Sequence, residues 1–513
     1  MMLLCVNFLT NRIYILGILF VFDAETKKKG KGEKGMQRRG TQAFPGGVHP
    51  TDGSDKALSM DQAVKPYRPD IVTILSEQTF GGTCQFTVTP GESVIEGQLI
   101  GKPEAFLAAP LHASISGTVL DVKEVEQLGR KITACIIRRG SDHCQVSHTD
   151  TSIPHDTAAE CAERKSVDYQ TEISDIRSIS REEILSGIRD GGLTGMGGAG
   201  FPTHKKYETD KPIDALLING AECEPFLTCD YRLMLEDAYA LINGVRLLLK
   251  GSGAKKAYLC LEDNKPKAAE HLTHILDEAK AKGLIATDET IELTVLPAKY
   301  PQGGERQLIQ AVLKREVPMG QLPADAGVIV SNVGTAKAAA DQILGNLPLT
   351  KRIITVTGLV AHPGNYLVPI GTSAKELLQF CGGVTAKENR IIAGGPMTGP
   401  CAASNWNGED ELFYITKSTS GILVLPDAAY EESPCIRCLG CADVCPAGLT
   451  PYQIEIAFLN EDYELCEELY ASECIACGCC SYICPAKRQL AVRTRMARDL
   501  VKQRMRERAV KSS

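Results

Sequence analysis

The sequence has no excess of positive charge, no hydrophobic run of membrane-spanning length and no recognisable set of nucleophilic catalytic residues. Its 56 Lys and Arg are outnumbered by 63 Asp and Glu, and the net charge of −7 gives no indication of nucleic-acid binding. The unbroken apolar run at residues 13–22 is about half of the ~20 residues that a helix needs to cross a bilayer. No Ser/His/Asp or Cys/His set is evident, so nothing points to covalent hydrolytic chemistry.

The first 43 residues have three possible interpretations. They are upstream sequence before a true start at Met36, or a disordered or membrane-touching extension, or a signal or anchor. Asn7, Asn11 and Arg12 interrupt the apolar stretch, and no small-residue cleavage site follows it. We expect residues 1–43 to form an extension outside the fold.

The remaining composition is typical of a multidomain globular protein, except for its cysteines. Apolar residues make up 43% of the 513 residues and charged residues 23%, which suggests three to four domains with separate cores. Twenty cysteines are too sparse for a disulfide scaffold, and eight of them fall in tight clusters. This pattern indicates metal binding in a reducing compartment.

The clustered cysteines form two C-x2-C-x2-C-x3-C-P runs, which end at Pro446 and Pro485. This spacing is the signature of bacterial ferredoxins with two [4Fe–4S] clusters, in which three cysteines of a run bind one cluster and the fourth binds the other. We expect the start of a helix to carry the fourth cysteine away. The predicted ligands of one cluster are Cys435, Cys438, Cys441 and Cys484, and those of the other are Cys474, Cys477, Cys480 and Cys445.

Zinc is the alternative for these runs, but zinc sites usually contain two pairs of cysteines rather than triplets with a distant fourth. Cys466 and Cys479 lie nearby but off the pattern, and we expect them to be buried free thiols or loop residues.

The order of segments predicts an α/β multidomain protein. Short apolar segments between Gly and Pro predict a β-sandwich hybrid domain over 44–160, and alternating strands and helices predict an α/β layer with a mostly parallel sheet over 165–345. Within that layer, Ser180 and Glu183 form a predicted capping box. A β-grasp module is expected over 350–420, and a helical, ferredoxin-like domain over 425–492. The basic tail, 493–513, either touches anionic lipid or an acidic partner, or is a solvated helix face.

A glycine-rich string lies in the α/β layer. Gly195, Gly197 and Gly200 fit G-x-G-x-x-G, but the preceding residues 181–190 predict a helix instead of the strand that a Rossmann fold requires. Closely spaced glycines let backbone N–H groups approach a flat or anionic ligand, and Lys205 and Lys206 would favour a phosphate. A flexible loop is the alternative.

Three further elements carry polar groups near strand ends. Asn219, Glu222 and Glu224 follow a predicted buried strand, where amide and acidic groups suit hydrogen bonds to ribose or ribityl hydroxyls. A solvated acidic loop is the alternative. The other two elements are Gly303-Gly304-Glu305 and Asn332-Val333-Gly334-Thr335.

These four elements, in this order, resemble the flavin- and NADH-binding subunit of respiratory complex I over residues 190–400. The resemblance implies that FMN is held by Gly195, Gly197, Gly198, Lys206, Asn219 and Glu222. It implies that Glu224 and Glu305 are catalytic carboxylates facing the nicotinamide nucleotide or flavin, and that Asn332 and Thr335 contact the phosphate side. Met196 and Ala221 depart from the Arg and Asp of that family.

Residues 40–495 as a whole resemble the RnfC family, a component of the Rnf/Rsx ion-translocating electron-transport complex. The resemblance rests on the Gly-Gly-Val-His-Pro sequence at 46–50, the glycine string and both cysteine runs. It implies two [4Fe–4S] clusters, FMN and NAD(H) in a peripheral protein on the cytoplasmic face of the inner membrane. Its partners would be other subunits of the complex and, indirectly, ferredoxin. The alternatives are a soluble cobalamin-reductase-like protein and a wiring subunit without a nucleotide site.

Overall fold

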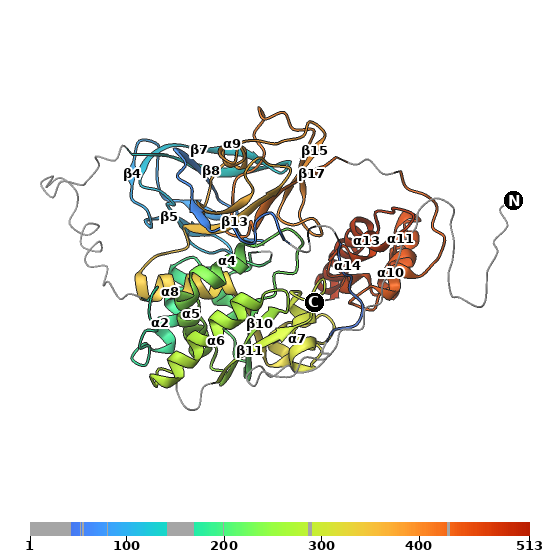
Figure 1. Cartoon of the computed structure of the whole chain (residues 1–513). Coiled ribbons are helices and arrows are strands. Elements are labelled where there is room, and N and C mark those ends of the chain that lie inside the picture. Colours follow the sequence, from blue (N-terminus) through green and yellow to red (C-terminus); the bar gives the residue numbers. More distant parts are fainter. Residues whose placement is uncertain are drawn as a thin grey trace, which may run out of the picture. The chain divides into compact units, whose positions relative to one another are not determined.

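The structure is a computed structural model that describes residues 43–51, 53, 56–79, 81–140, 169–198, 200–285, 290–427 and 431–512 (Figure 1). Apart from Ala43, the predicted N-terminal extension lies outside the described residues, as do Cys5, Cys144 and Cys161. No helix in the described part of the chain combines the length and apolar character needed to cross a bilayer.

Two antiparallel sheets follow the first described segment and form the predicted β-sandwich. One sheet has the order β2-β8-β7-β4 and the other β3-β5-β6. Alternate side chains of these strands, including Val72, Ile100 and Ile137, are fully buried between the sheets. The strands are β2 (Ile71–Leu75), β3 (Cys84–Phe86), β4 (Ser93–Val94), β5 (Leu99–Pro103), β6 (Leu111–His112), β7 (Gly117–Gln127) and β8 (Arg130–Arg139).

The next domain contains the predicted parallel sheet, with the order β11-β10-β9-β12. Leu216 and Ile218 pack with the helical core on one face, and Leu217 packs with α7 on the other. Both faces are covered, which explains why the strands are continuously apolar. The strands are β9 (Ala215–Gly220), β10 (Lys256–Glu262), β11 (Thr290–Leu296) and β12 (Val328–Asn332).

The helices of this domain are α2 (Arg181–Asp190), α3 (Thr203–Tyr207), α4 (Cys229–Glu236), α5 (Ala238–Ser252), α6 (Pro266–Ala281), α7 (Glu305–Leu313), η2 (Pro323–Ala326) and α8 (Val333–Gly345). The predicted capping box is confirmed, because Glu183 N donates to Ser180 Oγ at 3.1 Å and Ser180 N donates to the Glu183 carboxylate at 2.6 Å.

A six-stranded mixed sheet with the order β1-β14-β13-β17-β15-β16 contains the predicted β-grasp region. The sheet extends beyond the predicted limits of 350–420, because it includes β17 and also β1, which precedes the sandwich. Its elements are β1 (Val64–Pro66), β13 (Lys351–Gly358), β14 (Gly364–Pro369), α9 (Ala374–Phe380), β15 (Asn389–Ala393), β16 (Cys401–Ser404) and β17 (Gly421–Pro426).

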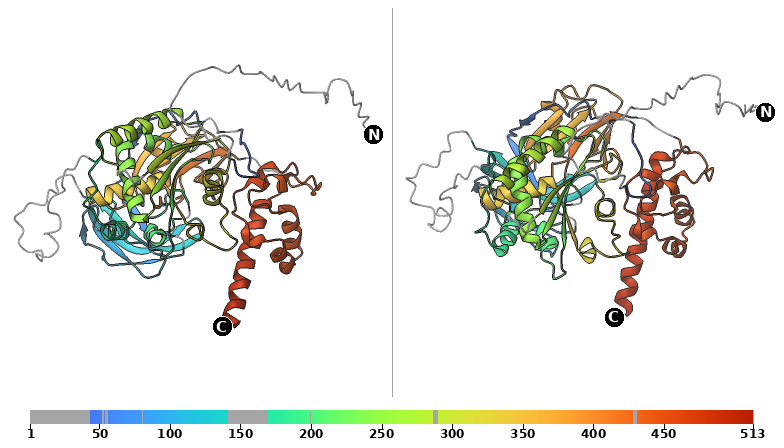
Figure 2. Two further views of the ribbon diagram at one scale, coloured as in Figure 1. Left: turned by 90° about the horizontal axis from the view of Figure 1, so that it is seen from below. Right: turned by 60° about the horizontal axis from the view of Figure 1, so that its bottom comes forward.

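The C-terminal region is helical, and the two helices expected between the cysteine runs are α11 and α12. Figure 2 shows the long helix α14, in red, running beside the shorter helices and continuing past them to the C-terminus. Ala497 and Val501 of α14 are fully buried against them, so the predicted boundary at 492/493 falls inside one packed helix. The elements are α10 (Gly440–Asp443), α11 (Pro451–Leu459), α12 (Tyr463–Glu468), η3 (Ala471–Glu473), α13 (Cys479–Ile483) and α14 (Leu490–Ser512).

Candidate functional site

Two cavities in the C-terminal region are each lined by four cysteines of the two runs. The first encloses about 350 Å³ and the second about 360 Å³, open solvent at their mouths included. Each brings together three cysteines of one run and the last cysteine of the other, which is the grouping derived above from spacing. The first cavity is lined by Cys435, Cys438, Cys441 and Cys484, and the second by Cys445, Cys474, Cys477 and Cys480.

The two runs share one backbone conformation. Arg437 and Leu439 have φ values of 53° and 65°, and the equivalent Ala476 and Gly478 have values of 55° and 85°. The left-handed turns bring backbone N–H groups onto sulfur: Arg437 N lies 3.4 Å from Cys435 Sγ, and Ala476 N lies 3.4 Å from the sulfur of the equivalent cysteine in its own run. Hydrogen bonds of this kind stabilise the charge of a bound thiolate.

The fourth cysteine of each run is placed differently from our expectation. Cys441 and Cys480 lie within the short helices α10 and α13, and Cys445 and Cys484 follow the ends of those helices. The helix therefore precedes the fourth cysteine instead of beginning at it. One short helical turn provides the displacement that takes this side chain to the other cavity.

Cys479 is fully buried and also lines the second cavity. A hydrogen bond from its thiol to Cys477 lowers the pKa of Cys477 and raises that of Cys479. Cys479 therefore remains a thiol while Cys477 is the better thiolate donor. The cysteines of both quartets are free, so no disulfide competes for these sulfurs.

The glycine string forms a closed loop with one packed side and one open side. Gly195 N donates to Phe201 O at 2.8 Å, which closes the loop. A Cβ at Gly197 would lie 2.7 Å from Asn332 Nδ2, so only glycine fits there, whereas a Cβ at Gly198 would meet no atom within 4 Å. The Thr335 hydroxyl accepts from Met196 N and donates to Thr194 O, both at 3.1 Å, and ties the loop to α8.

The strand ends expected to meet do meet in the structure. Asn332 caps α8 by accepting from Gly334 N at 2.7 Å, and its amide donates to Asp230 Oδ2 at 2.8 Å and to Asn219 O at 3.3 Å. The Asn219 amide donates to Gly303 O at 2.8 Å. Because β9 and β12 are parallel neighbours, their carboxyl ends place these groups beside the glycine loop.

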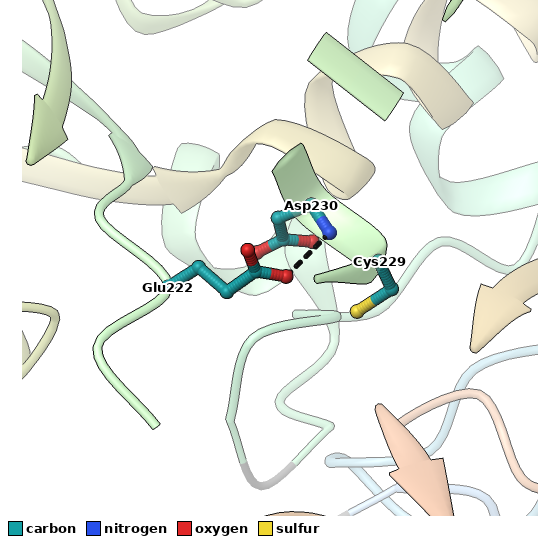
Figure 3. A group of neighbouring side chains, drawn as sticks. All are labelled: Glu222, Cys229 and Asp230. Carbon is teal, nitrogen blue, oxygen red and sulfur yellow. Dashed lines mark hydrogen bonds between the residues drawn. The ribbon is translucent and has the colours of Figure 1, made fainter. Parts of the chain in front are cut away.

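Glu222 is buried next to the N-terminus of α4 and has a φ of 46°. Its carboxylate accepts from Asp230 N at 2.7 Å and Tyr231 N at 3.3 Å, and Figure 3 shows it beside Cys229 and the Asp230 side chain. The possible ligand atoms of Glu222, Cys229 and Asp230 lie within 4.8 Å of one another. Burial raises the pKa of Glu222 to about 7 and also raises that of Asp230.

Asp230 and Lys56 were missed by the sequence reasoning. Lys56 Nζ is buried and donates to the carbonyl oxygens of Glu222, Glu224 and Leu227 at 2.6, 3.1 and 2.5 Å. It also lies 3.7 Å from the Glu222 carboxylate. Asp230 followed a strand end, which was a usable signal, but Lys56 lies in a segment without periodicity that carried none.

The two predicted catalytic carboxylates have separate partners. Glu305 Oε1 accepts from Lys206 Nζ at 2.8 Å, and this ammonium also donates to Val330 O at 3.0 Å. Glu224 accepts from Thr398 Oγ1 at 2.5 Å and from Met397 N at 3.1 Å, in the turn after β15. Burial raises the pKa of Glu224.

The same turn contacts the second cysteine cavity. Val48, Tyr300 and Cys479 form a buried cluster, hereafter the junction, against which Cys223, Met397, Val444 and Cys477 pack. Tyr300 Oη donates to Cys477 O at 2.7 Å, and a Cβ at Gly478 would lie 2.7 Å from Met397 O. Gly47 of the 46–50 sequence donates to Val444 O at 2.8 Å. Glu224 and the second cavity therefore contact the same short turn.

Several buried polar atoms around the glycine loop have no hydrogen-bond partner within the described ranges. They include the hydroxyls of Thr194 and Thr203, both amide atoms of Gln302 and Nε of Arg352. Buried polar groups in native proteins are nearly always hydrogen-bonded, so unpaired donors and acceptors here fit a ligand with many polar atoms.

Comparison with known proteins gives three domain matches and close full-length relatives. Family profiles match the RnfC barrel sandwich hybrid domain at residues 42–142, the Nuo51 FMN-binding domain at 188–341 and the SLBB domain at 353–400. A solved NAD+-reducing [NiFe]-hydrogenase is 23% identical with a TM-score of 0.46, over 62% of this chain and 61% of the other.

Two relatives show the family. The C component of the proton-translocating ferredoxin:NAD(+) oxidoreductase complex of Clostridium ljungdahlii is 37% identical over 436 residues, which are 84% of this chain and 87% of the relative. The C component of the Na(+)-translocating ferredoxin:NAD(+) oxidoreductase complex of Acetobacterium woodii is 36% identical over 470 residues, 90% of this chain and 98% of the relative. The mixed α/β fold, the matched domains and these identities together show that the chain belongs to the RnfC family of ion-translocating oxidoreductase complexes.

Proposed function

We propose that this chain is the peripheral electron-transfer subunit of a membrane-bound, ion-translocating ferredoxin:NAD+ oxidoreductase complex, on the cytoplasmic side of the inner membrane. It exchanges electrons between NAD(H), FMN and two [4Fe–4S] clusters, and its partners are the other subunits and, indirectly, ferredoxin. The observation that carries this proposal is the pair of four-cysteine cavities, one of which packs on the domain with the glycine loop. The names of the two relatives supply the complex.

The donor set of each cavity suits an iron–sulfur cube. Four sulfurs surround each cavity, and backbone N–H groups bond Cys435, Cys474 and Cys445 at 3.3–3.4 Å. These bonds and the thiol of Cys479 lower the negative charge that the sulfurs present, which makes reduction of the site easier. Zinc has no need of a fourth ligand from a distant run.

The glycine loop and the carboxyl edge of the parallel sheet suit a flavin mononucleotide. Gly198 leaves the loop open on one side, and the N–H groups there suit a flat ring or an anion. Asn219, Asn332 and Thr335 fix the shape of this edge through the bonds described above. When bound, a flavin accepts two electrons from NADH as hydride and releases them singly to one-electron acceptors.

The ionisable residues around this edge set its charge. Lys206 holds Glu305 in place at the start of α7, so that one carboxylate oxygen stays oriented by an ammonium. Glu222, with its pKa of about 7, holds a proton on its carboxyl over much of the physiological range, which limits the negative charge beside an anionic cofactor. Lys56 fixes the backbone that carries both Glu222 and Glu224.

The junction supports a direct route between the two sites. Glu224 binds the turn that contains Met397, and that turn touches Gly478 of the second cysteine run. The cysteines of the second cavity are therefore the nearer group to the glycine-loop domain, and those of the first cavity are farther along the module.

Anaerobic purification with flavin, iron and sulfide quantified tests the proposal. We expect FMN, about eight irons per chain, and bleaching of cluster absorbance when NADH is added. Zinc in the cavities, or about four irons or fewer, would overturn the two-cluster assignment. If no flavin copurifies and NADH leaves the absorbance unchanged, the chain is a wiring subunit; if it functions without a membrane complex, it is the soluble alternative.

A further inference from the structure

The two cysteine runs have the same backbone but opposite surroundings. Ala476 and Gly478 of the second run occupy the two left-handed positions where the chain packs on the rest of the protein. The equivalent residues of the first run are Arg437 and Leu439, which are both large and exposed. A Cβ at Gly478 would meet Met397 O at 2.7 Å, so the second run depends on a small residue to fit under its cover.

We propose that the exposed loop of the first run, Ile436–Leu439, is the docking face for an acidic subunit of the same complex. We call this loop the outer face. The inference rests on the proposed function, because it takes the first cavity as the end of the route farthest from the glycine loop.

The outer face has the composition of an interface core. Ile436 is 69% exposed and Leu439 50%, although both residues border a cavity lined by cysteines. Cys438 between them is also exposed, and Tyr482 and Ile483 add exposed apolar surface nearby. Contiguous exposed apolar residues on a soluble domain mark interaction sites, whereas single ones do not. No described segment of this chain covers these side chains.

Charge selects an acidic partner. The two charged residues that line the first cavity are Arg437 and Arg488. Arg488 is already bound to Glu455 at 2.6 Å, whereas Arg437 makes no ion pair with any residue in the described ranges. An exposed arginine within an apolar patch is a frequent hot spot, and its charge favours a carboxylate-rich partner. This local positive charge contrasts with the net charge of −7 of the whole chain.

The test is a binding measurement with the full-length, cluster-loaded chain. The probe is membrane from a strain that lacks this chain but retains the other subunits, and cosedimentation gives the dissociation constant. The variant is Arg437→Ala with Leu439→Gly, which gives the first run the residues that the second run already carries on the same backbone. Lys131→Ala, at an exposed lysine in β8 of the sandwich, is the matched control.

We expect the double variant to bind at least about tenfold more weakly, as for loss of a hot spot, while Lys131→Ala binds like wild type. Binding of the wild type should also weaken as salt rises. Iron content and the electron paramagnetic resonance spectrum of the reduced clusters should be unchanged, which shows that the loop is intact.

Three results would overturn the inference. Equal binding by wild type and the double variant would place the interface elsewhere. Equal binding to protein-free anionic vesicles would identify lipid as the occupant, and a dimer of the wild type that dissociates in the double variant would identify a second copy. Failure of the proposed function is distinguishable, because it appears in the wild type alone, as absence of NADH-dependent bleaching.

Discussion

Gly478→Ala should loosen the junction between the second cysteine cavity and the rest of the protein. Gly478 has a φ of 85°, and a Cβ there would lie 2.7 Å from Met397 O. Leu439 is the equivalent residue of the first run, with a φ of 65° and a side chain that is 50% exposed. Leu439→Ala is therefore a control with the same backbone conformation and no covering segment.

The expected effect has two parts. An L-residue in the left-handed region costs about 1–2 kcal/mol relative to glycine. The carbonyl of Met397 cannot simply turn away, because the N–H of the same residue donates to Glu224 at 3.1 Å. The contact must therefore be relieved by separating the turn from the loop, at the cost of about 1 kcal/mol of lost packing. A total of about 2–3 kcal/mol corresponds to an opening about 30- to 150-fold more frequent.

Native-state hydrogen exchange measures this opening directly. The N–H of Gly47 donates to Val444 O and that of Met397 donates to Glu224, so both report on the junction. Their exchange should accelerate by that factor in Gly478→Ala and stay within about twofold of wild type in Leu439→Ala. Unchanged exchange at both amides, in a variant that retains its full iron content, would refute this account of the junction.

Three other predictions concern the cysteine exchange, the buried acid and the buried lysine. Cys445→Ser should reduce iron from about eight to about four per chain and leave the same resonance spectrum as Cys474→Ser; matching Cys435→Ser instead would contradict the crossed assignment. Glu222 has a pKa raised to about 7, so the stability it contributes is full below about pH 4.5 and is lost as pH rises through 7. Denaturation at pH 5 and 8 should show that Glu222→Gln reduces this loss by about 2 kcal/mol, whereas equal pH dependence would show that Glu222 ionises normally. Lys56→Met leaves three buried carbonyls and a carboxylate without their cation and should destabilise the protein by about 3 kcal/mol in thermal unfolding. The exposed Lys65→Met is its control, and equal effects would refute the role of Lys56.

Local patterns in the sequence predicted the parts of the structure that depend on local rules. The capping box at Ser180 follows from residues three positions apart, and the parallel sheet follows from alternating strands and helices. Asn219 and Asn332 meet because the carboxyl ends of parallel strands share one edge, which the strand order alone implies. The grouping of the eight cysteines follows from spacing in the same way.

Contacts between distant loops were not predictable from such patterns. Lys56, Tyr300 and Met397 each act through backbone carbonyls or backbone packing, and no residue type is required for those partners. The pairing of β1 with β14 likewise joins a short, half-exposed segment to a sheet formed much later in the chain. The basic tail was misjudged for a similar reason, since Arg493 and Arg508 of α14 bind Glu455 and Glu467 inside the helical module.

The comparison of the two runs explains how a duplicated motif can have one covered and one exposed site. Cysteine spacing and two left-handed residues specify the loop, and both runs satisfy these requirements equally. What differs is the side chain at the two left-handed positions, which points away from the cavity toward whatever lies outside. Ala476 and Gly478 admit a neighbouring turn, whereas Arg437 and Leu439 would exclude it. The order of the two sites along an electron route is therefore set by four side chains that bind no metal.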